Sequence, residues 1–209
     1  MVLGSIALAV LAVEAALAGL READRVRFLA RVGVAGGALL VAMSLPLGPG
    51  VHLSFVPLAG ILLGPRGGFL AAFLASGVLS LFGHGGLTAF GANGLFLGSQ
   101  AVAASALFGL LRGVLAPRAS ALGAAGTTLL AAGAAAIALL AALPEGNPDG
   151  GHAGEGVGWG PVVVAGFALA AAAVETALTA SVVDFLSRVR PDLVPGSAGP
   201  RPREAEGPA

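Results

Sequence analysis

The chain has no cysteine and no lysine, and only 11% of its 209 residues carry a charge. Without cysteine there is no disulfide, iron–sulfur cluster or thiolate metal site, so imidazole, carboxylate, carbonyl or backbone nitrogen must hold any metal. An ordinary soluble domain carries about 25% charged residues. The hydrophobic fraction of 56% and the mean hydropathy of +0.93 leave too little polar surface for a water-facing globule. Lipid must therefore cover part of this protein.

The formal net charge is zero, which gives no electrostatic reason to expect a nucleic-acid partner. The sequence also lacks a phosphate-binding P-loop, a nucleophile elbow, an HExxH zinc motif and a paired-carboxylate hydrolase pattern. We therefore predict that the protein is not an enzyme, and that a separate subunit hydrolyses any ATP it uses.

Apolar runs of near-bilayer length follow one another along the chain, and about 20 apolar residues suffice for a helix to cross the hydrocarbon core. The predicted spans are Val2–Leu20, Phe28–Leu45, His52–Leu63, Gly67–Phe82, Thr88–Leu111, Ala119–Leu143 and Gly160–Leu186. The third is too short to cross as a straight helix, so we expect a buried or broken segment there. The pattern predicts an all-α, polytopic membrane helix bundle of about seven transmembrane segments.

Residues 1–190 form the predicted single transmembrane domain, and residues 191–209, rich in proline, glycine and charge, a disordered cytoplasmic tail. Orientation follows from the basic residues, which mark the cytoplasmic side. Seven crossings with the N-terminus outside and the C-terminus cytoplasmic place every arginine on one side, whereas six or eight would scatter them. The arginines are Arg21, Arg25, Arg27, Arg31, Arg66, Arg112, Arg118, Arg188, Arg190, Arg201 and Arg203.

All three histidines, His52, His84 and His152, fall on the opposite, outer side in this topology. His52 follows a Gly-Pro-Gly turn, and imidazole beside irregular backbone is a plausible ligand for Ni²⁺, Co²⁺, Zn²⁺ or Cu²⁺. The alternative is an interfacial histidine that hydrogen-bonds a loop carbonyl. For the acidic loop Pro144–Trp159, whose spacing matches no metal motif, a solvated loop is the better interpretation.

Phe82–Asn93 is the most distinctive stretch, because its four glycines permit tight turns and close backbone approach. Asn93 then lies inside an apolar span, where an amide needs a partner. Glu14 and Glu175 are carboxylates within apolar spans, and such residues are expected to face the bundle interior as functional candidates. The competing interpretation for each is a protonated acid that hydrogen-bonds its neighbours.

Four stretches resemble one known family. His52–Pro65 is similar to its Gly-His-Leu, small and apolar residues, then Ile-Leu-Leu-Gly-Pro; Phe82–Asn93 is similar to its Phe-Gly-Asp-Gly-Gly-Leu-Thr-Ala-x-Gly-Ala-Asn. Glu175–Thr179 and Phe185–Leu193 resemble its Glu-Ala-Leu-Ile-Thr and Arg-Pro-Asp-Leu. The family is the CbiM/NikM type, the substrate-capture membrane components of energy-coupling-factor (ECF) transporters for cobalt and nickel. The resemblance covers nearly the whole chain in matching order.

The resemblance implies a multi-pass protein of a bacterial or archaeal plasma membrane that captures Co²⁺ or Ni²⁺ outside and releases it inward. The partners it implies are a membrane coupling (T) subunit, a pair of ATPase subunits and a small auxiliary membrane subunit. The ion is cargo, so no cofactor is expected. His52 matches a family ligand histidine and His84 is a further candidate ligand, with Thr88, Asn93 and Glu175 as supporting residues.

The sequence departs from the family at its start, where Met1-Val2-Leu3-Gly4 replaces the Met-His-Ile-x-Asp-Gly opening that supplies family ligands. It also has His84 where the family has Asp, and no Thr-Ser-Gly before His52. Two interpretations stay open: the reading frame begins upstream of Met1, or His84, with or without His152, replaces the missing ligands. The alternative functions are a degenerate member that acts as a membrane scaffold without binding metal, and a capture component for a small organic solute.

Overall fold

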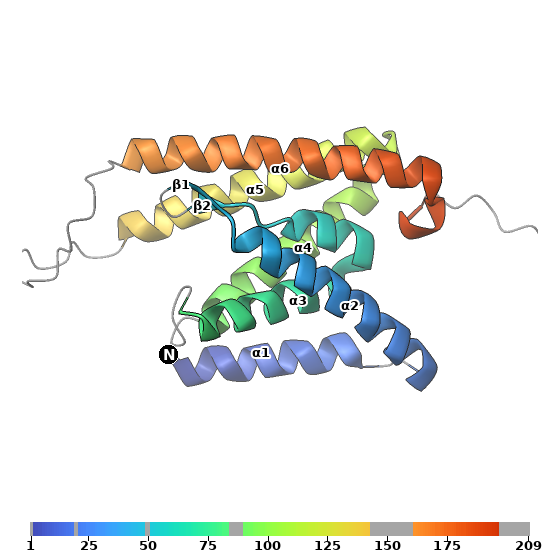
Figure 1. Ribbon diagram of the computed structural model, residues 1–209, viewed down its shortest axis with the longest axis horizontal. Helices are drawn as coiled ribbons and strands as arrows, with labels where there is room; N and C mark the ends of the chain where they lie inside the picture. Colours follow the sequence, from blue (N-terminus) through green and yellow to red (C-terminus); the bar gives the residue numbers. More distant parts are fainter. Residues whose placement is uncertain (1, 19–20, 49–50, 84–89, 143–160, 197–209) are drawn as a thin grey trace, which may run out of the picture.

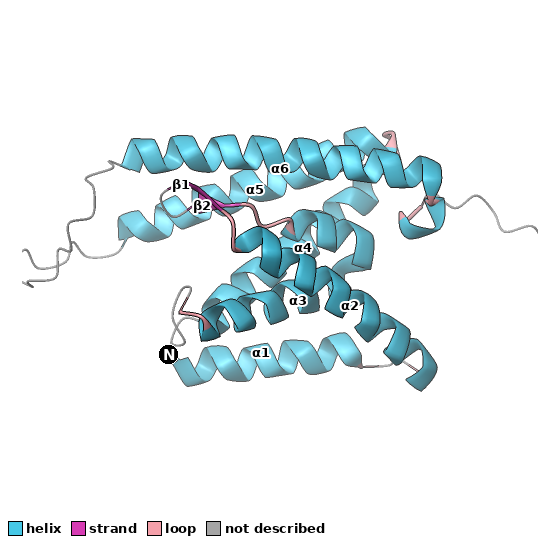
Figure 2. Cartoon of the chain, viewed as in Figure 1, coloured by secondary structure: helices cyan, strands magenta, loops and turns pink. Residues whose placement is uncertain are grey.

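The computed structural model describes residues 2–18, 21–48, 51–83, 90–142 and 161–196. Over these residues the protein is a bundle of six α-helices with one short antiparallel strand pair between the second and third helices (Figures 1 and 2). The expected helical bundle is thus confirmed, with the strand pair as an addition. In chain order the elements are α1 (Val2–Leu17), α2 (Glu22–Met43), β1 (Pro46–Gly48), β2 (Val51–His52), α3 (Val56–Leu81), α4 (Phe90–Leu111), α5 (Pro117–Ala142), α6 (Pro161–Val189) and the 3-10 turn η2 (Pro191–Leu193).

Each predicted span corresponds to a helix or to part of one, and five of the described helices are long and apolar enough to cross a membrane. α1 has 16 residues and a length of about 24 Å, which is shorter than the hydrocarbon core. The third and fourth predicted spans both lie within α3. The protein is therefore a multi-pass helical membrane protein, while the count of seven crossings stays a prediction.

α3 is broken at Gly64, and the break turns the chain back on itself. Gly64 has φ 74° and ψ 178°, a conformation that is essentially restricted to glycine, and Pro65 follows it. A Cβ atom added to Gly68 would lie 2.6 Å from the Cα of Gly60, whereas a straight helix separates residues eight apart by about 12 Å. The third predicted span, His52–Leu63, is therefore not one straight helix: it begins in β2 and ends in the short helical segment Val56–Leu63, and the break follows it directly.

Glycines allow α4 to pack closely against both segments of α3. A Cβ atom on Gly60 would lie 2.1 Å from the carbonyl oxygen of Ala101 in α4. On α4 itself, a Cβ on Gly94 or Gly98 would lie within 2.6 Å of the ring of Phe73 or Phe69. Small residues let helix backbones approach in this way in membranes. The contact fixes α3 and α4 relative to each other, and both helices contribute to the candidate site.

Two buried clusters hold the remaining helices to this central pair. One joins α1 and α2 to α3 and includes Val32, Leu39 and Leu70. The other joins the first turns of α3 to α4, α5 and α6 around Ile61 and Phe108. Figure 1 accordingly shows α1 along one edge of the bundle, α5 and α6 along the other, and α3 and α4 between them.

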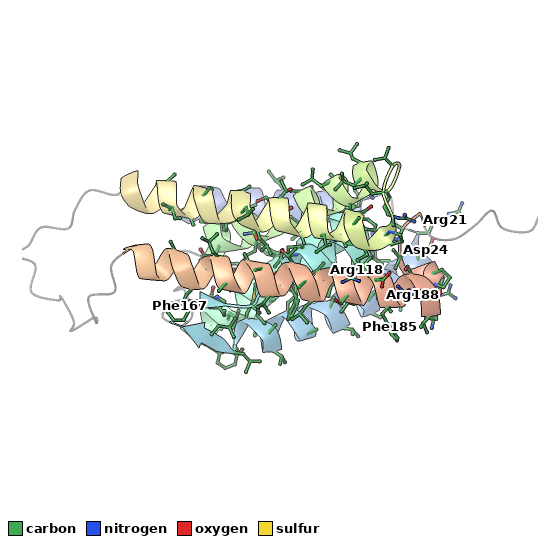
Figure 3. All side chains as sticks on the ribbon, turned by 90° about the horizontal axis from the view of Figure 1, so that it is seen from above. Arg21, Asp24, Arg118, Phe167, Phe185 and Arg188 are labelled. Carbon is green, nitrogen blue, oxygen red and sulfur yellow. The ribbon has the colours of Figure 1, made fainter. Side chains whose placement is uncertain are left out.

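Arginines gather at one end of the bundle. Figure 3 shows Arg21, Arg118 and Arg188 at the same end, far from Phe167 near the start of α6. The Arg66 guanidinium, at the break in α3, donates to the carbonyl oxygen of Ala18 at 3.2 Å, just beyond the end of α1. These arginines lie at one end, as the positive-inside rule predicts, while the orientation of the chain in the membrane stays a prediction.

The start of the predicted disordered tail packs against the bundle. Val194, directly after η2, is only 2% exposed, and Arg112 donates to the carbonyl oxygen of Gly196 at 3.1 Å. Residues 191–196 thus belong to the folded part of the chain, because an apolar side chain and a backbone carbonyl find partners there. The rest of the tail lies outside the described residues.

Candidate metal-binding site

The strand pair between α2 and α3 positions His52. β1 and β2 are antiparallel, and Pro46 is the partner of His52 in their register. Three residues then link β2 to α3, and the last of them, Phe55, has a left-handed backbone with φ 51°. A bulky residue in this conformation costs on the order of 1–3 kcal/mol and persists only where the surrounding structure holds it.

The link is held by Glu175 of α6, a helix that packs beside the strand pair. The backbone N–H of Ser54 donates to Glu175 Oε2 at 2.9 Å, and its hydroxyl donates to Oε1 at 2.8 Å. Glu175 is only 3% exposed, so water does not compete for these bonds. The Ser54 hydroxyl also accepts from the N–H of Val56, the first residue of α3, at 3.4 Å. One buried carboxylate therefore fixes the residues that connect His52 to α3.

His52 opens onto a cavity of about 340 Å³ enclosed by α2, the link, α3 and α4. The polar side chains that line it are His52, Ser54, Ser76 and Asn93, and the thioether of Met43 at the end of α2 joins them. The other described residues of the lining are apolar. The cavity thus collects donors from four separate parts of the chain.

The donors suit a neutral site with one strong ligand for a transition metal. Imidazole binds Ni²⁺ and Co²⁺ well, whereas amide and hydroxyl oxygens are weaker ligands that can also hydrogen-bond the ion's remaining water. Among the described residues, no three His, Cys, Asp or Glu side chains come together to hold a metal. A complete coordination sphere therefore needs donors in addition to His52.

The structure brings two of the predicted site residues, His52 and Asn93, to one cavity, although 41 positions separate them in the numbering. Glu175 reaches the same site indirectly, through Ser54. His84, Thr88 and also His152 lie outside the described residues.

The expectation for Glu14 was wrong, because this carboxylate is exposed on the surface of α1. α1 packs against the bundle through other positions, among them Val13 and Ala16. A carboxylate in an apolar helix can lie on the outer face where the helix is at the edge of the bundle, as α1 is (Figure 1).

Sequence reasoning missed Met43, Ser54 and Ser76. Ser54 could have been found, since residues two apart in an extended segment point to the same side and His52 precedes it by two. Ser76 carried a weaker signal as a polar residue in an apolar run. Met43 carried none, because its place at the cavity depends on the turn between α2 and β1.

Comparisons with known proteins identify the family of the chain. The sequence model of the family CbiM, described as cobalt uptake substrate-specific transmembrane region, matches residues 1–193. Searches of curated proteins and of solved structures gave no significant match. This family is one of transporter components that work with other subunits, and it is not an enzyme family. The match covers more than nine-tenths of the chain, and the chain belongs to the CbiM family of cobalt uptake transmembrane proteins.

Proposed function

We propose that the protein is the substrate-specific membrane component of an ECF-type ABC transporter that takes up Co²⁺ or Ni²⁺. The observation that carries the proposal is the shared cavity of His52 and Asn93. An imidazole from one part of the chain and an amide from another face one small space, in a chain whose family takes up cobalt.

In this proposal His52 binds the ion through its imidazole, and His84 is a second candidate ligand. Asn93 and Thr88 support the site by hydrogen-bonding to ligands or to water on the ion, as outer residues do around metal sites. Glu175 acts through Ser54, and it determines where the backbone after His52 lies. The ion is the cargo, and no resident cofactor is needed.

The proposed direction of transport follows from the two ends of the bundle. The arginine-rich end faces the cytoplasm by the positive-inside rule. Figure 1 shows β2, the strand of His52, towards the opposite end, which is the outer end in this orientation. The bound ion would be released inward when a membrane coupling (T) subunit reorients the protein. A pair of ATPase subunits supplies the energy, and a small auxiliary membrane subunit completes the complex.

The test is a titration of the purified full chain with Ni²⁺ and Co²⁺ by isothermal calorimetry, beside His52→Ala, His84→Ala and His152→Ala. We expect His52→Ala to abolish binding. Loss of affinity in His84→Ala as well would make it a ligand, whereas an unchanged affinity would remove it from the site. His152→Ala tests in the same way whether the third histidine is a ligand.

The titration is repeated on a chain extended by the family's Met-His-Ile-x-Asp-Gly opening, which supplies the ligands absent at Met1. If neither form binds either ion, the metal proposal is wrong, and the scaffold and organic-solute alternatives remain.

A small organic solute is a second candidate, because the cavity volume of about 340 Å³ exceeds the space that one ion needs. Pockets for small molecules begin at about 300 Å³. Native mass spectrometry of the purified protein distinguishes the two candidates. An organic adduct that is lost in the cavity-filling variant Ser76→Leu would favour the solute, whereas a metal adduct that is lost in His52→Ala favours the ion.

A further inference from the structure

An apolar groove runs along the outside of the bundle between α2 and α6. It has a volume of about 770 Å³, more than twice that of the cavity at His52. Its walls are one face of α2 with Val34 and Ala38, and the face of α6 with Leu178. Leu58 and Leu62 of the first α3 segment form its floor. Figure 1 shows α2 and α6 diverging on either side of this short segment.

The groove is apolar along its length but charged at one end. Arg31 of α2 and Asp192 of η2 line that end. Asp192 is already engaged by Arg190, which donates to both carboxylate oxygens at 2.9 Å. These hydrogen bonds hold the pKa of Asp192 below its usual value, and the charge of Arg31 contributes to the effect. Two guanidinium groups therefore share one carboxylate, which leaves one positive charge at the end of the groove.

We infer that the groove holds one anionic phospholipid, with its phosphate on the Arg31 guanidinium and its acyl chains along Ala38, Leu58 and Leu178. A site with one charged end and a long apolar wall matches the shape of an amphiphile. Basic pockets between transmembrane helices on the cytoplasmic side bind anionic headgroups, and guanidinium suits phosphate geometrically. Arg31 is the last of the four arginines between residues 21 and 31, and it lines the groove together with Asp192 of η2, which follows the end of α6.

Other occupants fit less well. The chain continues from Gly196 beside the groove, but residues 197–209 consist of proline, glycine, alanine, serine and charged residues and offer no apolar segment. A helix of a partner subunit would cover the apolar walls, yet it would need an acidic residue to neutralise the net charge at Arg31. A single phospholipid molecule covers the apolar walls with its acyl chains and neutralises the charge at Arg31 with its phosphate.

The first experiment measures lipid retention by native mass spectrometry of the full chain in detergent. Phosphatidylglycerol and phosphatidylcholine with identical acyl chains are compared, and we expect preferential retention of phosphatidylglycerol. Arg31→Gln should weaken that retention about tenfold, as expected for loss of a charge-assisted hydrogen bond. Arg27→Gln, also exposed on α2 but outside the groove, is the matched control and should change nothing. Equal retention of both lipids, or equal effects of the two substitutions, overturns the inference.

A second pair of variants tests the apolar part. Ala38→Trp fills the groove and should abolish retention of the lipid, whereas Val41→Trp adds the same side chain at an exposed α2 position outside it. Circular dichroism and gel filtration confirm that both variants fold. If the two behave alike, the lipid does not lie in the groove.

A photo-crosslinking residue at Ala38, activated in cell membranes, then identifies the occupant. An adduct with the mass of a phospholipid supports the inference. An adduct with a transporter subunit or with a second copy of this chain overturns it. Because these measurements need no metal, they can fail or succeed independently of the proposed transport function.

Discussion

The cavity at His52 and the groove at Arg31 are lined by neighbouring residues of one link, residues 53–55 between β2 and α3. Ser54 lines the cavity and Phe55 lines the groove. The cavity is small and lined by imidazole, amide and hydroxyl groups, whereas the groove is more than twice as large and almost entirely apolar. A few polar side chains determine what the cavity can bind, and a broad wall of interchangeable side chains determines what covers the groove.

This difference matters because the two regions should respond differently to substitution. Removing one polar side chain takes away a ligand, or a group that positions a ligand, and none of the other described lining residues supplies the same group. Removing one methyl group from the groove changes only a small part of a large surface. Changes to the shared link, or to the break in α3, should affect both regions together.

The largest expected effect is a loss of metal binding at the cavity that leaves lipid binding at the groove unchanged. His52→Ala removes the one imidazole among the described residues that line the cavity, and we expect the affinity for Ni²⁺ or Co²⁺ to fall by more than about 100-fold, beyond the loss typical of supporting residues. Lipid retention at the groove should not change. Calorimetry and native mass spectrometry on the same preparation measure both, and a parallel loss of both would show that the variant is simply misfolded.

Gly64→Ala should disturb both regions, since the α3 segment before the break lines the groove with Leu58 and the segment after it lines the cavity with Ser76. A Cβ atom added at Gly64 would have no neighbouring atom within 4 Å, so the penalty is backbone strain alone, about 1–3 kcal/mol. The midpoint of thermal unfolding should fall.

The control for this substitution is Gly133→Ala on α5, which also has free space but regular helical backbone. Alanine should raise stability there, by up to about 1 kcal/mol. If both substitutions shift the midpoint of thermal unfolding in the same direction, the inference that the backbone at Gly64 is strained is wrong.

Glu175→Ala and Glu175→Gln test whether the link is held by hydrogen bonds or by charge. Alanine leaves the Ser54 N–H without its acceptor, and we expect metal affinity to fall about tenfold, as for other supporting residues. Glutamine can still accept from that N–H and donate to the Ser54 hydroxyl, which rotates to accept, so its affinity should stay near wild type. Calorimetric titration compares the two, with Glu14→Gln on the exposed face of α1 as control. Equal losses in both variants would mean that the charge itself is required.

The smallest effect concerns pH at the charged end of the groove. Arg190 lowers the pKa of Asp192, so the pair stabilises the fold above the ordinary aspartate pKa of about 3.9. That contribution is lost as the pH falls through the lowered value. Both side chains are exposed, so the change should be slight. Thermal unfolding between pH 5 and pH 2 should show a small acid-side loss that is absent in Asp192→Asn; an identical loss in the variant would assign it to other carboxylates.

Much of the helical architecture could be predicted from the sequence, because the length of an apolar run indicates whether a helix can cross the lipid bilayer. The break in α3 was also predictable, since a Gly-Pro pair interrupts an apolar run that is too short to cross. The exposed position of Glu14 was not, because an apolar run does not say which face of an edge helix meets the bundle.

The candidate site was predictable only in part. His52 and Asn93 stand in recognisable motifs, so the sequence could name them before their common cavity was known. Met43 and Ser76 belong to no motif, and their places depend on how α2 and α3 pack. The groove was invisible in the sequence, because it is a space between α2 and α6 rather than a property of either helix.

The amino-acid sequence is enough to show that this chain belongs in a membrane and that it is a member of the cobalt uptake family. These features depend on composition and on local runs of residues. Only the tertiary structure decided that Glu175 holds Ser54 across 121 positions, and that one link separates a polar cavity from an apolar groove. The physical reason is that hydrogen bonds between distant residues exist only once close packing through glycine has brought the helices together.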